Sequence, residues 1–203
     1  MRLATLYLRS RRAGYACAGV SCVALLAWGA GHVILTRPSV VTVYLSPVLV
    51  FASLLAACLI AVGASSPFGD AERTASRSLP ALRFGHLGGL LAWAALCFLL
   101  VTLLWGRGSA ALVLLRDLAG LSGLALLAAG ALGSRLSWTL PVAFVAVIPL
   151  VGDGSGDSRW AWWAWVDQPA GEPTSWALAV VLFVLGFGLV CSSGAANVVG
   201  EAE

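Results

Sequence analysis

The sequence of 203 residues contains no lysine, and all 12 of its basic residues are arginines. A P-loop needs a lysine that reaches the nucleotide phosphates, and a Schiff base needs the amine of a lysine. The sequence therefore excludes both, and we expect that the chain does not hydrolyse ATP by itself. Charge is scarce as well, because only 10% of the residues are charged, against roughly 25% in an ordinary soluble domain.

Signatures of metal and hydrolytic sites are also missing. The sequence has no HExxH motif, no GxSxG motif and no CxxC pair. Its two histidines, His32 and His86, have no partner at the spacing of metal ligands. The five cysteines lie inside apolar segments, where small buried hydrophobes are expected: Cys17, Cys22, Cys58, Cys97 and Cys191. We therefore expect no catalytic residue, no metal and no cofactor in this chain.

Apolar residues are abundant, since 60% of the residues are hydrophobic and the mean hydropathy is +0.94. A helix that crosses a bilayer needs about 17 to 25 residues. Six segments approach or reach this length, namely residues 13–35, 40–64, 84–105, 109–132, 136–151 and 175–199. The rest of the chain is too short for a soluble domain. We therefore predict an all-α polytopic membrane protein in which residues 1–203 form a single domain of six transmembrane helices.

Arginines fall mainly on one side of these six spans. With the N-terminus inside, the cytoplasmic segments contain eight arginines: Arg2, Arg9, Arg11, Arg12, Arg73, Arg77, Arg83 and Arg135. The outer segments contain three: Arg37, Arg107 and Arg159. Because cytoplasmic loops collect arginine near helix ends, we expect both termini in the cytoplasm. Arginine without lysine is typical of a high-GC genome, so we expect a prokaryotic inner membrane, and the net charge of +3 indicates loop topology and no nucleic-acid partner.

Two segments outside the spans are expected at the membrane surface. Residues 1–12 place Arg9, Arg11 and Arg12 before the first span, either on an interfacial amphipathic helix or on a solvated basic tail. The longest outer segment, residues 152–174, contains a tryptophan cluster: Trp160, Trp162, Trp163 and Trp165. Indole rings prefer the headgroup level, so this cluster is expected to form an aromatic belt or to cap a re-entrant structure near residues 150–175.

The fourth span contains two adjacent charges, Arg116 and Asp117. Charged groups at membrane depth are costly, so this pair is a possible intramembrane polar site. Adjacent helical residues point about 100° apart, so the two side chains are not expected to face each other well. Two interpretations fit. Either the span begins at Ser109 and Asp117 is a substrate or proton site, or residues 107–117 lie along the outer surface and Arg116 reaches water. The second is favoured.

The cytoplasmic loop of residues 65–83 concentrates charge between the second and third spans. Asp70, Glu72, Arg73 and Arg77 have spacings typical of a short exposed helix that ends before Pro80. A bare connection between antiparallel helices needs only about 2 to 8 residues. The extra length favours a docking element for a soluble partner, while a loop that only supplies positive charge also fits.

In these features the chain resembles, over nearly its whole length, the membrane (permease) subunit of ABC-2 type exporters. The resemblance rests on the basic N-terminal segment, the six spans, the charged loop and the longer outer segment. Glu72 and Arg73 match the Glu-Arg pair of the family's coupling helix, and Thr74 follows them. The resemblance implies a separate ABC ATPase subunit that binds ATP and Mg and contacts the loop. It also implies a second membrane subunit, identical or different, with a transport path between the two.

Other classes of protein fit the same topology. A non-transporting membrane scaffold or immunity protein is consistent with the absence of a catalytic motif. A secondary carrier with two inverted halves is disfavoured, because residues 1–105 do not visibly repeat in residues 106–203. In any of these classes, small residues are expected to let helices approach closely, at Gly85 and Gly89, Ala119 and Gly123, and Gly188 and Ser192.

Overall fold

The computed structural model describes residues 13–36, 41–63, 79–151 and 163–193. Within these ranges the chain is all-helical and contains no strand. The α-helices are α2 (Ala13–Leu35), α3 (Val41–Gly63), α5 (Leu79–Leu104), α6 (Gly108–Leu132), α7 (Thr139–Val151) and α8 (Pro173–Ser193). Two short 3-10 helices are η2 (Ser134–Leu136) and η4 (Trp165–Asp167). The all-α prediction is confirmed for this part of the chain.

Four of these helices are long and apolar enough to cross a membrane: residues 14–35, 83–104, 108–132 and 173–192. Two further apolar stretches are shorter, at residues 47–63 and 134–149. These properties are those of a membrane protein, because about 20 apolar helical residues match the hydrocarbon thickness.

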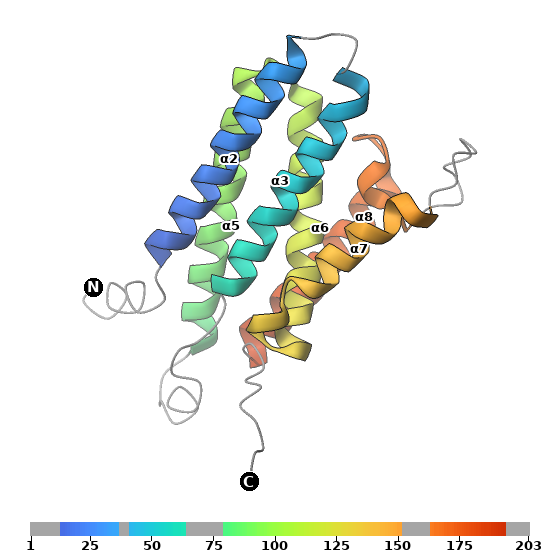
Figure 1. Cartoon of the computed structure of the whole chain (residues 1–203). Coiled ribbons are helices and arrows are strands. Elements are labelled where there is room, and N and C mark those ends of the chain that lie inside the picture. Colours follow the sequence, from blue (N-terminus) through green and yellow to red (C-terminus); the bar gives the residue numbers. More distant parts are fainter. Residues whose placement is uncertain (1–12, 37–40, 64–78, 152–162, 194–203) are drawn as a thin grey trace.

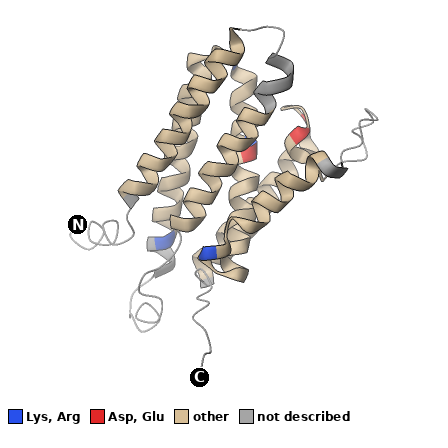
Figure 2. Ribbon diagram, in the orientation of Figure 1, with Lys and Arg blue, Asp and Glu red and all other residues tan. Residues whose placement is uncertain are grey.

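The helices alternate in direction along the bundle (Figure 1). As a result, Ala13 at the start of α2, Gly63 at the end of α3 and Ser193 at the end of α8 lie at the same end. Arg83 in the second turn of α5 and Arg135 in η2 mark this end with positive charge (Figure 2). We call it the arginine end.

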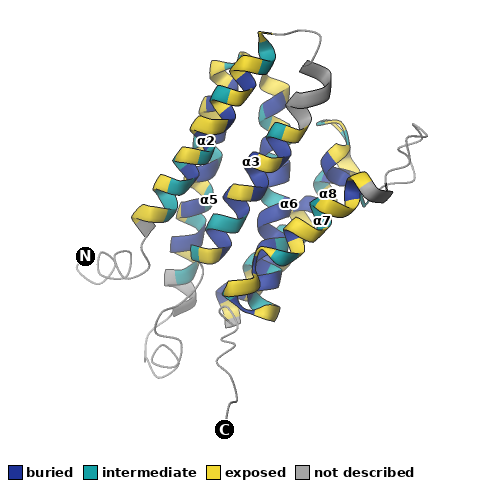
Figure 3. Cartoon of the chain, viewed as in Figure 1, coloured by how far each residue is buried: buried dark blue, intermediate teal, exposed yellow. Residues whose placement is uncertain are grey.

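Helix α6 is the centre of the bundle, since it contacts α3, α5, α7 and α8. Its buried side chains form a nearly continuous run (Figure 3). The closest approach is to α8, where a Cβ added to Gly123 would collide with the backbone of Leu182 and one added to Gly186 would collide with the carbonyl of Gly123. The predicted packing role of Gly123 is thus confirmed. Gly85, Gly89 and Gly188 face open space instead.

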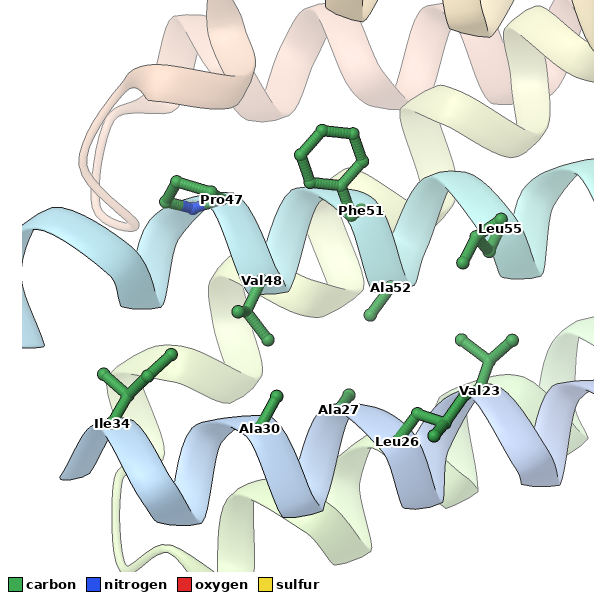
Figure 4. Close-up of a pocket in the computed structure, with 10 residues that line it drawn as sticks. All are labelled: Val23, Leu26, Ala27, Ala30, Ile34, Pro47, Val48, Phe51, Ala52 and Leu55. Atoms are coloured by element: carbon green, nitrogen blue, oxygen red, sulfur yellow. The ribbon is translucent and has the colours of Figure 1, made fainter. Parts of the chain in front are cut away.

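The α2–α3 pair is packed less tightly. An apolar cavity of about 360 Å³ opens between the two helices (Figure 4). Its lining includes Ala27 and Ala30 from α2 and Val48, Phe51 and Ala52 from α3. Small side chains on both helices leave this space unfilled.

Several helix boundaries differ from the sequence-based ones. Helix α5 begins at Leu79, so the predicted loop of residues 65–83 ends earlier than expected. Pro80 lies in the first turn of α5, where its missing N–H has no intrahelical partner to lose. The fifth span was expected to begin at residue 136, whereas α7 begins at Thr139, after the 3-10 helix η2.

Candidate functional site

Many of the predicted site residues lie outside the described residues. These are the coupling residues Asp70, Glu72, Arg73 and Arg77, the interfacial arginines Arg9, Arg11 and Arg12, and the tryptophans Trp160 and Trp162. The structure therefore bears on four predicted positions: Arg116, Asp117, Trp163 and Trp165.

Arg116 and Asp117 lie inside an uninterrupted helix, because α6 runs from Gly108 to Leu132 without a break. Both side chains are fully buried. The favoured interpretation, in which residues 107–117 lie along the surface and Arg116 reaches water, is therefore wrong. The expectation that the two side chains do not face each other is also wrong. Nε of Arg116 donates to Oδ1 of Asp117 at 3.1 Å, since the long arginine side chain curls back past its neighbour.

The guanidinium of Arg116 is bound to a loop that is about 50 residues away in the sequence. Nη1 donates to the carbonyl oxygens of Gln168 at 2.8 Å and Pro169 at 3.2 Å, and Nη2 donates to that of Val166 at 2.9 Å. Nη1 also lies 3.3 Å from Oγ of Ser175, whose own hydroxyl donates to the carbonyl of Glu172. An arginine has five N–H donors, and these acceptors together with Asp117 are enough for all of them.

The loop offers these carbonyls because η4 is a single 3-10 turn. Within it, the N–H of Asp167 donates to Ala164 and that of Gln168 to Trp165, which leaves the following carbonyls without a helical partner. Residues 163–172, which we call the strap, are thereby fastened to α6 and to the first turn of α8.

Trp165 fastens the strap a second time. Its indole ring lies over Gly120, where a Cβ would collide with it, and stacks on Phe144 of α7 with centroids 5.5 Å apart. The ring is fully buried, so Trp165 packs inside the protein and does not present its indole on the outer surface of the bundle. The physical reason is the missing side chain of Gly120, which leaves room for the ring between the helices. Trp163 is half-buried.

Two polar atoms beside this contact have no hydrogen-bond partner in the described structure. They are Oδ2 of Asp117 and Nε1 of Trp165, and both are buried. Buried polar atoms are normally paired, so unpaired ones need an explanation such as bound water or a functional role. The six-membered ring of this indole covers Gly120, which is one helical turn beyond Asp117 on α6.

Asp167 adds an acidic residue to the strap next to these contacts, and its residue is exposed. Its neighbours Val166 and Gln168 both accept hydrogen bonds from Arg116. Burial raises the pKa of Asp167, and the positive charge of Arg116 opposes this shift. Within the described ranges no group of three or more histidine, cysteine or acidic residues could hold a metal ion.

Sequence reasoning identified Arg116 and Asp117 but missed their partners. Three of the acceptors are backbone carbonyls, which carry no side-chain signal. The nearest signal is Gly120, one helical turn after Asp117, since glycine in a helix often marks a close approach.

Comparisons with family models, with curated proteins and with solved structures found no match to this chain.

Proposed function

We propose that the chain is the membrane subunit of an ATP-driven ABC-type exporter, coupled through residues 65–83 to a separate ATPase that binds ATP and Mg. The observation that supports this most is the arrangement of the arginine end. Gly63 and Leu79, which flank the charged loop, lie there together with Arg83 and Arg135. By the positive-inside rule this end belongs in the cytoplasm, where an ATPase would act.

The helix contacts supply a route for such coupling. Helices α3 and α5, which the loop joins, both pack on α6. At the other side of the bundle α6 holds the strap through Arg116. A force on the loop would therefore act on α3 and α5, both of which contact the central helix α6. On this proposal the chain spans a prokaryotic cell membrane six times with both termini in the cytoplasm, and it pairs with a second membrane subunit of the same or a different kind.

The first experiment tests the orientation of the loop. In a variant with the five native cysteines replaced by alanine, Arg73→Cys should resist a membrane-impermeant maleimide added to intact cells. The matched control is Thr174→Cys, whose position on the opposite end is exposed and should be labelled. Labelling of Arg73→Cys from outside would put the loop on the wrong side and refute the proposal.

The second experiment tests the coupling itself. The tagged chain, purified from native membranes, should retain an ATPase subunit that mass spectrometry identifies by its P-loop sequence. The double variant Glu72→Ala, Arg73→Ala should lose this subunit or its transport-linked ATP hydrolysis, whereas membrane insertion is unchanged. The control Arg135→Ala removes an exposed charge at the same end and should retain both.

A non-transporting membrane scaffold or immunity protein is the second candidate. The observation in its favour is that protein groups already bind the guanidinium of Arg116, which leaves it no donor for a substrate. This candidate predicts that the purified chain carries no ATPase and that Glu72→Ala, Arg73→Ala has no effect on transport of any kind.

A further inference from the structure

His86 is a buried ionisable side chain near the start of a helix that is long enough to cross a membrane. It lies in the second turn of α5, and only 4% of the residue is exposed. Ionisable groups inside membrane helices are costly and rare, so each one calls for a partner and a role. Nε2 of the His86 ring lies 3.3 Å from the carbonyl oxygen of Gly63, within hydrogen-bond distance. Because a carbonyl oxygen can only accept, Nε2 carries the proton of this hydrogen bond.

Gly63 is the last residue of α3, and the carbonyls of a last helical turn have no partner within their own helix. His86 supplies a partner from the neighbouring helix. A second contact holds the same residue, since a Cβ added to Gly63 would lie 3.3 Å from Cδ1 of the buried Leu90. Leu90 follows His86 by one helical turn, so both lie on one face of α5. One polar and one apolar contact therefore fit the end of α3 against α5.

These contacts lie where the two helices have little else in common. Among the described residues, α3 and α5 each pack mainly on α2 and α6, and they contact each other over a short stretch only. The loop between them does not hold their ends together either, because residues 64–78 can extend over roughly 50 Å. The hydrogen bond of His86 therefore acts at the place where the separation of the two loop ends is decided.

We propose that His86 is a positioning residue for the charged loop. Its Nε2 fastens the end of α3 to the start of α5, so that both ends of residues 64–78 are held at one separation. This deepens the proposed function and in part rests on it, since a loop with fixed ends would pass a displacement by the ATPase to α3 and α5 together. Without the hydrogen bond the ends can separate, and the loop absorbs part of the displacement.

The first experiment measures the separation of the two helix ends and needs no ATPase. In the full chain without native cysteines, spin labels are attached to Val62→Cys on α3 and Gly85→Cys on α5, both at exposed positions. Electron paramagnetic resonance in lipid nanodiscs should give a narrow distance distribution. His86→Leu should broaden or shift it, because loss of the hydrogen bond changes the ratio of joined to separated ends by roughly fivefold to tenfold. His86→Gln should restore the narrow distribution, since its amide N–H can still donate.

The matched control is His32→Leu, which removes an exposed histidine near the other end of α2 and should leave the distribution unchanged. A distribution in His86→Leu that equals the wild type, or one that His86→Gln does not restore, overturns the proposal. If His86→Leu does not fold, nitrogen NMR of the histidine-labelled wild type decides. The chain has only two histidines, so His32→Gln assigns the signals. An Nε2 of His86 that carries a proton supports the proposal, whereas one without a proton cannot donate to Gly63 and overturns it.

The second experiment tests the consequence for coupling. In the complex purified with its ATPase, His86→Leu should retain the ATPase subunit but lose most of the transport-linked ATP hydrolysis, and His86→Gln should keep it. Unchanged transport-linked hydrolysis in His86→Leu overturns the coupling role. If no ATPase accompanies the wild-type chain, the exporter assignment fails and the coupling role fails with it, whereas the distance measurement still decides whether His86 positions the loop.

Discussion

The bundle has two helix pairs that are built in opposite ways. Between α6 and α8 the backbones touch at Gly123 and Gly186, and the end of this interface is closed by the hydrogen bonds of Arg116. Between α2 and α3 the contact is apolar and leaves an open cavity of about 360 Å³. The α6–α8 pair is held by hydrogen bonds and a glycine contact that form at only one relative position of the helices. The α2–α3 pair is held by buried apolar surface area.

This difference indicates which part of the molecule has a fixed shape. Directional hydrogen bonds and a glycine contact fail when the helices move by an ångström, because neither can be re-formed at another angle. Apolar contacts between alanines and valines tolerate such shifts. We therefore expect α6, α7, α8 and the strap to move as one unit and the α2–α3 pair to accommodate change.

The largest effect is expected from Arg116→Met. It removes the charge partner of Asp117 and leaves the carbonyls of Val166 and Gln168 unpaired. Loss of one partner from a buried ion pair costs about 3 to 5 kcal/mol of unfolding free energy. The measurement is denaturation of the purified protein in detergent, followed by size-exclusion chromatography. Arg107→Met, at an exposed arginine before the same helix, is the control and should change the stability by less than about 0.5 kcal/mol. Equal effects of the two variants would refute the role of Arg116.

A smaller loss is expected from Gly123→Ala. The new methyl group would meet the backbone of α8, which cannot rotate away as a side chain can, so the helices must separate. Overpacking of this kind costs about 1 to 3 kcal/mol. Gly188→Ala on α8 is the matched control, since a Cβ there meets nothing within 4 Å, and it should be neutral or stabilising by up to about 1 kcal/mol through helix propensity. Thermal unfolding of the two variants side by side checks the sign of the difference.

The smallest effect is expected in the α2–α3 cavity. Ala30→Leu enlarges an exposed side chain that lines this cavity. It should change the free energy of unfolding by less than about 1 kcal/mol. The control Ala57→Leu introduces the same side chain at a fully buried position of α3 outside that lining, where overpacking should cost about 1 to 3 kcal/mol. A large loss for Ala30→Leu would mean that this pair is as closely specified as α6 and α8.

The long apolar runs made most of the described helices predictable. The span expected at residues 13–35 coincides with α2, and the one expected at residues 109–132 differs from α6 by one residue. Hydropathy and length decide such segments almost alone. The start of α5 was missed because Pro80 and the charge before it resemble a loop, although proline is well accepted in the first turn of a helix.

The site was predictable only in part, for a different reason. Charge within an apolar span drew attention to Arg116 and Asp117, but their spacing said nothing about the strap. The arginine side chain is long enough to fold back and contact the adjacent residue. The angle of about 100° between the Cα–Cβ directions of adjacent helical residues does not predict this contact. Trp165 was assigned to a surface because tryptophan often lies there, and only the packing of α6 and α7 shows that Gly120 and Phe144 receive it.

The hydrogen bonds of Arg116 also have a consequence for the order of synthesis. Its acceptors on the strap and on Ser175 follow it by 50 to 59 residues. The ribosome therefore completes α6 before it has synthesised most of the hydrogen-bond acceptors of the Arg116 guanidinium. Until α7 and the strap have been translated, Arg116 has only Asp117 as a partner. Helix α6 therefore cannot complete its hydrogen bonds before the C-terminal part of the chain has been synthesised. A chain truncated before residue 163 should contain α6 without the acceptors of Arg116, and we expect the cell to degrade it.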